Sequence, residues 1–522
     1  MPAFNRRTFM KTGLAGSAFL ASLDVALLGS AGAQDGAPKK GGTLSYAQLS
    51  ANRRSASLGN SRHPYFIVDA NTRIQWNCLT WVNPNLGWEL ELASKVEPSD
   101  ERLNVWNVTV REGVTFHNGR EVTAADVASS FDYHRREAPF ARQIVKIEPI
   151  SKYVAQFTLD SGNSEFPYIL AEYNSVIMPA GDLATIGMDG IGTGPFKIVA
   201  SDPNRSLVME RYDGYWRKGF PYLDRLEIHN REGQQESALN GLRAGQFDAV
   251  LNIDARAAAQ LQNDPAFDIE SAKGGYSFVV QLPKHPGSPF LDKRVRQALA
   301  FAIDREAIVR IAYGGKFGWV GNDSHLMVTD PAFVPRPGGR DVARAKRLLA
   351  EAGYPNGIDL GTLYWSPQLP EAGRYFQVFQ ASAKDAGITL ALEERPNDGY
   401  IQFRSGDEDF SKGKFHKFAM TAVGSRNPGI SLYRMRANYL ESGHWRGPEH
   451  DQYMALYNQA MVTAEPDKRK ALYAAMQAIL HEEVPALLPA GGDTFLVKRK
   501  AVRAMPYHPQ IWSIRFDETW KA

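Results

Sequence analysis

The chain contains 522 residues, of which 43% are hydrophobic and 22% charged, and its formal net charge is +3 at pH 7. A charge so close to zero provides no electrostatic basis for binding nucleic acid or an anionic membrane surface. The only cysteine, Cys78, excludes an internal disulfide and a cysteine-ligated iron–sulfur cluster, and its apolar neighbours predict a small buried hydrophobic residue. The length is sufficient for two or three domains of about 150 residues each.

Residues 1–33 have the pattern of an export signal rather than of a folded segment. A twin arginine, Arg6 and Arg7, is followed by a mildly apolar run and by a small-x-small cleavage pattern at 31–33. Asp24 lies inside the apolar run and argues against a membrane anchor, because an acidic side chain at the bilayer centre costs about 2.5–3.5 kcal/mol. The segment resembles a Tat signal peptide, and no cysteine near the cleavage pattern offers a site for lipid attachment. We therefore expect export by the Tat translocase and a free periplasmic protein.

The N-terminal part of the mature chain predicts strands and one helix. β-prone residues at 41–47 predict a first strand, and alternating apolar residues predict strands at 91–97 and 106–110. Apolar side chains between 69 and 82 recur at helical spacing and predict a helix there. We find no second long apolar segment after the export signal.

Two motifs in the next part of the chain suggest a function, but their residues favour structural roles. His117 lies in a predicted turn, where a structural hydrogen bond is the simpler interpretation. The Gly-Thr-Gly-Pro-Phe motif at 192–196 lacks the third glycine of a dinucleotide-binding loop, and its proline removes a donor where a phosphate needs backbone N–H groups. We interpret it as a turn that enters a strand at 196–199. Between the two motifs, Thr123 and Asp126 form a capping-box pattern that predicts the start of a helix.

The stretch 289–315 predicts two consecutive amphipathic helices, each with its own cap. Asp292 is a good N-cap for the first helix and Asp304 for the second, because a carboxylate can accept from the free N–H groups of a first turn. The second helix is expected to stop at the glycine pair 314–315. The apolar stripe of the first helix consists of Val295, Ala298, Leu299 and Ala302. The opposite face carries Lys293, Arg294, Arg296 and Gln297.

The remaining chain predicts an alternation of strands and helices. A β-prone run at 276–282 precedes the helix pair, and an apolar helical face at 343–352 follows it. A strand at 360–364, a helix at 374–385 and a strand at 388–392 then alternate. This order is typical of an α/β domain.

Several of these motifs together resemble the family 5 solute-binding proteins, the peptide, nickel and opine receptors of bacterial ABC importers. The most specific is residues 292–306, which read D-K-R-V-R-Q-A-L-A-F-A-I-D-R-E, and similar matches occur at 111–119, 192–196 and 345–354. The resemblance covers nearly the whole mature chain. It implies an α/β, bilobed periplasmic binding protein (type II, cluster C-like) with an extra inserted domain and a hinge between the lobes.

The same resemblance implies a division of the mature chain. Lobe I would comprise 40–73, 191–272 and 491–522, the inserted domain 74–190, and lobe II 273–490. The solute would be enclosed by hinge closure, and the closed form would dock on a membrane permease with its ATPase. We expect a monomer that is not an enzyme, with no cofactor, metal, catalytic residue or nucleic-acid partner.

The resemblance also selects candidate ligand-binding residues. Peptide-binding members carry an acidic pattern, G-D-x-x-D-P, that pairs with the α-amino group of the ligand. The matching stretch 423–428 has no carboxylate, and Arg426 stands there between Ser425 and Asn427. A planar guanidinium suits a carboxylate or phosphate, so an opine or sugar phosphate fits as well as a peptide, unless Arg426 is solvated or pairs with a surface acid. The other candidates are Trp445, Trp365, Tyr364 and Arg374 from lobe II, and Asn77 and Trp81 from the opposing side.

Two alternatives from other functional classes stay open. The chain has no G-x-S-x-G motif, and the stretch 481–485 lacks the second histidine of a H-E-x-x-H helix. An exported hydrolase acting on oligosaccharide or peptide would therefore need a pair of acids that the sequence does not reveal. A periplasmic chaperone or sensor could also use the same fold.

Overall fold

The computed structural model describes most of the chain after residue 36. The described residues are 37–49, 72–137, 141–182, 189–202, 205–231, 233–285, 287–397, 399–405, 417–435, 445, 447–463, 465–505, 507–510 and 513–522. The predicted export signal, including Arg6 and Arg7, lies outside the described residues. Among the residues described, no helix combines the length and the apolar character needed to cross a membrane.

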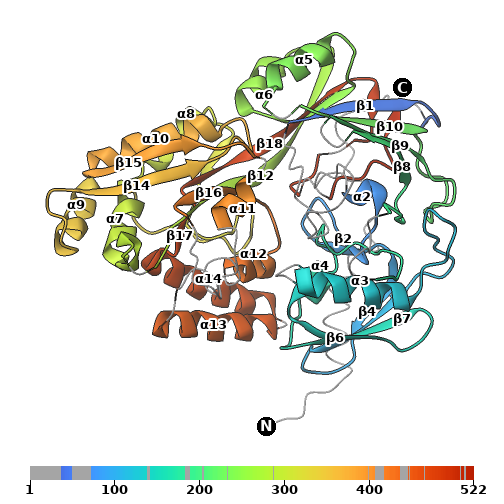
Figure 1. Ribbon diagram of the computed structural model, residues 1–522, viewed down its shortest axis with the longest axis horizontal. Helices are drawn as coiled ribbons and strands as arrows, with labels where there is room; N and C mark the ends of the chain where they lie inside the picture. Colours follow the sequence, from blue (N-terminus) through green and yellow to red (C-terminus); the bar gives the residue numbers. More distant parts are fainter. Residues whose placement is uncertain are drawn as a thin grey trace.

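Within the described residues, twelve strands form one mixed sheet that runs through the whole molecule (Figure 1). The main order is β15-β14-β16-β12-β18-β11-β1-β10-β9-β8, with β13 paired to β18 and β17 paired to β12. Two long antiparallel strands lie in the middle, β12 (Phe267–Gln281) and β18 (Ala490–Arg499). They cross from the right half of Figure 1, which contains the first lobe, to the left half, the second lobe.

The first lobe consists of the strands beyond β18 and two covering helices. β1 (Thr43–Gln48) lies between β10 (Arg225–Asn230) and β11 (Ala249–Ile253) and is parallel to both. The other elements are β8 (Phe196–Asp202), β9 (Ser206–Arg211), α5 (Gln235–Arg243), α6 (Ala255–Leu261), β19 (Val502–Arg503) and β20 (Trp520–Lys521). The predicted first strand and the strand after the Gly-Thr-Gly-Pro-Phe turn are confirmed.

Between β1 and β8 the chain builds a separate four-stranded antiparallel sheet, β4-β5-β7-β6, which with its helices we call the inserted subdomain. The elements of this part are β3 (Trp88–Leu90), β4 (Ala93–Pro98), β5 (Val105–Val110), α3 (Ala124–Glu137), β6 (Ile144–Pro149), β7 (Val154–Leu159) and α4 (Phe166–Ile169). The strands predicted at 91–97 and 106–110 are present as β4 and β5. The capping box is confirmed, since the Asp126 carboxylate accepts from the Thr123 N–H at 2.8 Å and from its hydroxyl at 3.0 Å.

The helix predicted over 69–82 is wrong for most of its described length. α2 covers only Thr72–Gln75, and the chain then forms β2 (Thr80–Val82), which pairs with β3. The Cys78 N–H donates to the carboxylate of Glu91 at 3.0 Å instead of to a carbonyl one turn earlier. A buried acid from another segment therefore overrides the helical spacing of the apolar residues.

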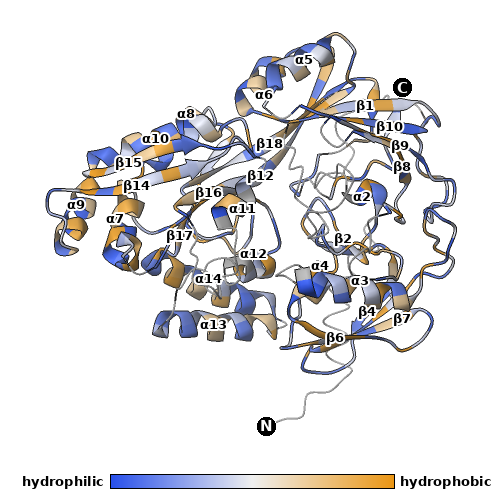
Figure 2. Cartoon of the chain, in the orientation of Figure 1, coloured by the Kyte–Doolittle hydropathy of each residue, from blue (hydrophilic) through white to orange (hydrophobic). Residues whose placement is uncertain are grey.

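The second lobe contains the strands on the other side of β12 and several helices (Figure 1). Its elements are η3 (Pro289–Leu291), α7 (Lys293–Ala302), α8 (Arg305–Ala312), β13 (Gly318–Val320), α9 (Val342–Glu351), β14 (Ile358–Trp365), α10 (Ala372–Asp385), β15 (Ile388–Glu394), α11 (Tyr400–Ser405), β16 (Ala419–Gly424), α12 (Pro428–Met435), α13 (Pro448–Met461), α14 (Pro466–Glu483) and β17 (Ala486–Leu487). The alternation predicted between residues 360 and 392 is confirmed by β14, α10 and β15. Figure 2 shows hydrophilic and hydrophobic stretches alternating along peripheral helices such as α9 and α10, as expected for helices that lay one face on a core.

The two capped helices predicted at 289–315 are confirmed as α7 and α8. Asp292 accepts a hydrogen bond from the Arg294 N–H at 2.8 Å, and Asp304 accepts one from the Ala307 N–H at 2.8 Å. All four residues of the predicted apolar stripe are fully buried. The cap and the stripe are local features, so the sequence contains what is needed to place them.

The opposite face of α7 is partly buried, which its polar residues did not predict. The Arg296 guanidinium donates to the carbonyl of Glu483 at 2.9 Å, and the Gln297 amide donates to the carbonyl of Glu482 at 2.8 Å. Both acceptors lie in the last turn of α14. The end of that helix therefore covers α7 and provides partners for its polar side chains.

β12 changes its register where it crosses between the lobes. The pairing of β12 with β18 breaks between Ala272 and Tyr276. Gly274, inside the break, has a φ of +65°, a value that favours glycine. Such a bulge bends a strand locally, so the two lobes meet at a bend in the sheet.

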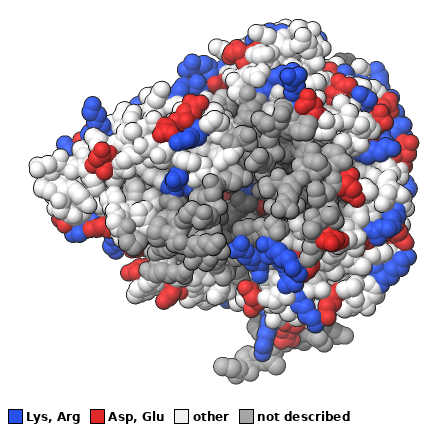
Figure 3. Space-filling view, viewed as in Figure 1, with Lys and Arg blue, Asp and Glu red and all other residues white. Residues whose placement is uncertain are grey.

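The inserted subdomain also packs against the second lobe. Phe166 of the inserted subdomain and Tyr453 of α13 belong to one buried hydrophobic cluster. Nearby, the Ser164 N–H donates to the carbonyl of Met461 at 2.7 Å. Figure 3 shows basic and acidic side chains interspersed over the described part of the face seen in Figure 1.

Candidate ligand-binding site

Four neighbouring strands align a row of residues on one face of the sheet. Val423 of β16, Ser277 of β12, Gly491 of β18 and Trp319 of β13 lie directly opposite one another. Residues that are opposite in antiparallel strands share a face of the sheet. Val423 and Trp319 belong to the same buried cluster as Phe166, so this face looks toward the inserted subdomain.

Arg426, in the loop after β16, is buried and paired. Its guanidinium lies 3.3 Å from the carboxylate of Glu172 and donates to the carbonyl of Gly424 at 3.1 Å. The two side chains of the ion pair are 5% and 3% exposed. The alternative of a solvated arginine, or of one paired with a surface acid, is therefore wrong. Because Glu172 belongs to the inserted subdomain, the pair joins two separate parts of the molecule.

Ser425 and Asn427 flank Arg426 and are both buried. The Ser425 N–H donates to the carbonyl of Gly275 at 3.1 Å, which extends the pairing of β16 with β12 as far as the crossing. Among the described residues, the Ser425 hydroxyl has no hydrogen-bond partner. The Asn427 side-chain oxygen accepts from the Gly429 N–H at 2.9 Å and caps α12. The structure thus brings these three candidate residues together beside the crossing.

A second acid of the inserted subdomain, Glu165, reaches the same loop. It accepts a hydrogen bond from the Tyr473 hydroxyl at 3.1 Å, and the nearby Asn427 side chain favours its charged form. Burial raises the pKa of Glu165 above its ordinary value, although the nearby Arg469 guanidinium opposes this effect. Glu165 and Glu172 fit no sequence motif, and contact in the folded structure is the only signal that identifies them.

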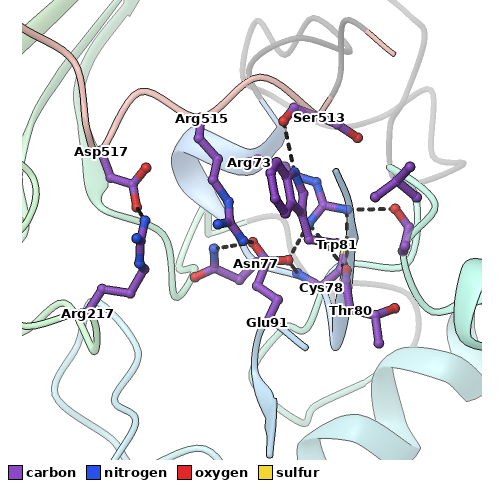
Figure 4. A network of polar contacts seen from close by, with 12 residues as sticks. Arg73, Asn77, Cys78, Thr80, Trp81, Glu91, Arg217, Ser513, Arg515 and Asp517 are labelled. Atoms are coloured by element: carbon purple, nitrogen blue, oxygen red, sulfur yellow. Dashed lines mark hydrogen bonds and ion pairs between the residues drawn. The ribbon is translucent and has the colours of Figure 1, made fainter. Parts of the chain in front are cut away.

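Asn77 lies beside a buried carboxylate, that of Glu91 (Figure 4). Glu91 accepts from the Asn77 amide at 3.1 Å and pairs with the Arg73 guanidinium. The amide oxygen of Asn77 accepts from the indole N–H of Trp216 at 3.1 Å. Both ends of the Asn77 amide are therefore used within the protein.

Trp81 lies on the other side of this network and is held by the C-terminal segment (Figure 4). Its indole N–H donates to the carbonyl of Ser513 at 2.9 Å, and the guanidinium carbon of Arg515 lies 3.7 Å from the ring centroid. The same guanidinium is 3.9 Å from the Glu91 carboxylate. Burial raises the pKa of the neighbouring Cys78 thiol to about 12, as expected for the small buried residue that the sequence predicted.

Arg374 bridges the two lobes. Its guanidinium donates to the carboxylate of Asp254, in the first lobe, at 3.0 Å. One turn earlier on the chain, Glu371 accepts from the Ala255 N–H at 3.3 Å, and burial raises the pKa of Glu371 to about 7. The structure therefore places Arg374 in the contact between α10 and the start of α6.

The aromatic candidates of the second lobe lie in different packing environments. Trp445 belongs to the buried cluster that includes Val423, on the face toward the inserted subdomain. Trp365 packs against another cluster, which includes Tyr276, the residue before Ser277 in β12. The aromatic partners are Phe403 for Tyr364 at 4.9 Å, Phe376 for Trp365 at 6.3 Å and Tyr453 for Trp445 at 5.8 Å between centroids.

His117 has the structural role that the sequence predicted. Its ring bonds to the carbonyl of Gly194 at 3.0 Å and accepts from the Gly192 N–H at 3.2 Å. Burial lowers the pKa of His117 to about 4, so the ring is neutral near pH 7. In the described ranges, no three His, Cys, Asp or Glu side chains are grouped closely enough to hold a metal ion.

Known proteins resemble this chain over most of its length. The glutathione-binding protein GsiB of Escherichia coli (strain K12) is 24% identical over 413 residues, which cover 76% of this chain and 78% of GsiB. The structure of the PBP AgaA from A. tumefacien R10, in complex with agropinic acid, matches with a TM-score of 0.76 and 22% identity over 92% of this chain and 99% of that one. The oligopeptide-binding protein AppA from Bacillus subtilis, in complex with a nonapeptide, matches with a TM-score of 0.77 and 20% identity over 93% and 100%.

The bilobed α/β fold implied by the sequence motifs is the fold of these two structures. Residues 88–438 match the family model described as bacterial extracellular solute-binding proteins, family 5 Middle. That match covers more than half of the chain. This protein therefore belongs to the family 5 bacterial extracellular solute-binding proteins.

Proposed function

We propose that this protein is the solute receptor of a bacterial ABC importer, which encloses a small solute between its lobes and delivers it to a membrane permease and ATPase. The observation that carries the proposal is the buried ion pair between Arg426 and Glu172, because a hinge motion would separate its two partners. The register break between Ala272 and Tyr276 supports a hinge where β12 crosses. No bond is made or broken in this function.

The division into lobes follows the same crossing. We propose boundaries at residues 272–273 and 490–491, with the inserted domain over 74–190. The break in β12 after Ala272 and the start of β18 at Ala490 support the first two. We also propose that the receptor works as a monomer, which sedimentation velocity of the mature protein would test.

We propose that Ser425, Arg426 and Asn427 contact the solute from one side, opposite Asn77 and Trp81, which lie beside Glu91. The loop has no carboxylate, and Glu172 is already paired with Arg426, so a ligand ammonium would compete with a guanidinium for it. Simple di- and tripeptides should therefore bind weakly. An anionic or polyhydroxylated solute should bind with a Kd near micromolar, about −8 kcal/mol. The relatives are described as binding glutathione or as complexes with agropinic acid and a nonapeptide. These ligands differ too much in chemistry to choose between a peptide and an anionic or polyhydroxylated solute.

Isothermal titration calorimetry against two panels tests this prediction. The first panel contains di- and tripeptides, and the second contains opines, sugar phosphates and polyols. Native mass spectrometry of protein purified from its own periplasm would report the mass of a trapped solute. If peptides bind tightly and Arg426→Ala does not change their affinity, the predicted preference for anionic or polyhydroxylated solutes is wrong. Absence of any bound solute in both experiments would contradict the receptor function itself.

We propose that the protein reaches the periplasm by the Tat route and is not lipid-anchored. Replacing Arg6 and Arg7 with lysine should leave unprocessed precursor in the cytoplasm, because the twin arginine is what distinguishes the segment from a general export signal. Cell fractionation with immunoblotting measures this. Arg53 and Arg54 are another pair of consecutive arginines, outside the predicted signal. Replacing both with lysine is a matched control and should leave export intact. Normal periplasmic yield of the Arg6 and Arg7 variant would falsify the Tat assignment.

A further inference from the structure

Trp319 lies across a glycine on the face of the sheet that looks toward the inserted subdomain. Its strand, β13, pairs with the start of β18, and Trp319 is directly opposite Gly491. A Cβ at Gly491 would overlap the Cε2 and Cζ2 atoms of the indole. Because Cε2 carries the ring nitrogen, the N–H edge of the indole lies over β18. The glycine therefore makes room for the ring to reach toward β12.

The N–H group of this indole is buried without a partner among the residues that the structure describes. Trp319 is 8% exposed, and its Nε1 has no hydrogen-bond partner within the described part of the chain. The hydroxyl of Ser425, which is 1% exposed, has none either. In the row between them, by contrast, the Ser277 hydroxyl donates to the carbonyl of Ala490 at 3.0 Å. Buried polar groups of native proteins are nearly always paired, so two unpaired ones at one site indicate a missing partner.

The two groups lie on the same face of the sheet. Gly491 is opposite Ser277, which is opposite Val423. Ser425 follows the end of β16, and its N–H still bonds to Gly275 of β12, so it continues the alternation of the strand and shares the face of Val423. Since the indole reaches over Gly491, two strand spacings and a two-residue step along the chain, together roughly 12 Å, separate the indole N–H from the serine. That distance is too long for them to bond each other and suits a small molecule between them.

We propose that Trp319 and Ser425 form an uncharged hydrogen-bonding subsite for the solute. The proposal rests on the proposed function, since it deepens the assignment of the same site. An indole N–H can only donate, so its partner is an oxygen acceptor such as a carbonyl, carboxylate or hydroxyl, and not an ammonium. The serine hydroxyl donates to or accepts from a second polar atom. Arg426 and Glu172 neutralise each other nearby, so the subsite carries no net charge. It should therefore bind an oxygen-rich part of the solute, such as an amide or a polyol.

Two conservative variants test the subsite. Ser425→Ala removes only the hydroxyl, and Trp319→Phe removes the indole N–H together with the ring atoms that lie over Gly491. The loss of one neutral hydrogen bond should weaken binding about three- to tenfold. In Ser425→Ala the melting temperature without solute should stay nearly unchanged, because the hydroxyl has no partner among the described residues to lose. In Trp319→Phe the melting temperature should fall because buried packing is also lost, so its affinity is measured on the folded protein. Trp88→Phe, at an exposed tryptophan of β3, is the matched control and should leave affinity unchanged.

The probes are glutathione, agropinic acid, dialanine and mannitol, together with any solute that co-purifies from the periplasm. Affinity is measured by calorimetry, and retention of the co-purified mass by native mass spectrometry. In 15N-labelled protein, the indole resonance that is missing from Trp319→Phe should move when a bound probe is added. A solute that binds the native protein and both variants equally, or leaves that resonance in place, overturns the subsite. If nothing binds the native protein, the proposed function fails and the subsite fails with it.

Discussion

Arg426→Met should weaken the closed form by about 3–5 kcal/mol, because Glu172 would lose the guanidinium that it contacts inside the protein. The two groups are 3.3 Å apart, and their side chains are 5% and 3% exposed. Arg426 belongs to the second lobe and Glu172 to the inserted subdomain. If the lobes open, Glu172 can be hydrated again, so the variant should open rather than unfold. The ratio of closed to open molecules should fall by a factor of about 100 or more.

Small-angle X-ray scattering of the ligand-free protein measures this opening as an increase in the radius of gyration, and calorimetry measures the accompanying loss of solute affinity. Glu172→Leu combined with Arg426→Met should recover part of the loss, because no charge of the pair then remains buried. Arg136→Met is a matched control. Arg136 pairs with Asp132 at 2.9 Å but is 57% exposed, so its removal should change stability by less than about 1 kcal/mol. Unchanged scattering and affinity in Arg426→Met would show that the pair does not contribute to closure.

Leu299→Ala should lower the free energy of unfolding by about 2–5 kcal/mol. Leu299 lies on the apolar stripe of α7, is fully buried and belongs to the cluster between the sheet and the helices of the second lobe. Truncation leaves a cavity that a close-packed interior fills only in part, so the loss of packing adds to the loss of apolar burial. Solute affinity of the folded molecules should change little, because Leu299 supports the lobe and is not among the residues proposed to contact the solute.

Urea denaturation followed by circular dichroism measures the change in unfolding free energy. Leu291→Ala provides a control of identical chemistry, since Leu291 is 51% exposed a few residues earlier and should tolerate the change. A shift of the Tm of Leu299→Ala below about 1 °C would mean that the stripe does not face the core.

Features that depend on neighbouring residues could be predicted well. The caps of α7 and α8 and the capping box at Thr123 are present as expected, because a cap is an interaction between residues two or three apart in the chain. The alternation of β14, α10 and β15 follows from hydrophobic period in the same way. The helix expected at 69–82 failed because Glu91, a residue outside the window, binds the backbone N–H of Cys78.

The candidate site could be predicted only in part. The motif match placed Ser425, Arg426 and Asn427 in one loop, and the structure has them together beside the crossing. Nothing in the chain near Arg426 indicated that Glu172, 254 residues away, would bury its charge. Nothing in the chain near Trp319 indicated the position of its indole N–H either, because that position depends on Gly491, which lies opposite in another strand.

The sequence by itself determined the capped helices α7 and α8, the alternation of β14, α10 and β15, the family and the bilobed plan, because caps, hydrophobic periods and motifs are contained in short stretches. Only the tertiary structure decided which polar groups are paired. Pairing depends on distances between segments that the chain brings together from far apart, and burial makes each unpaired group costly. The charge of Arg426 is therefore neutralised by Glu172 of the inserted subdomain. The Ser425 hydroxyl and the Trp319 indole N–H, by contrast, have no hydrogen-bond partner among the described residues.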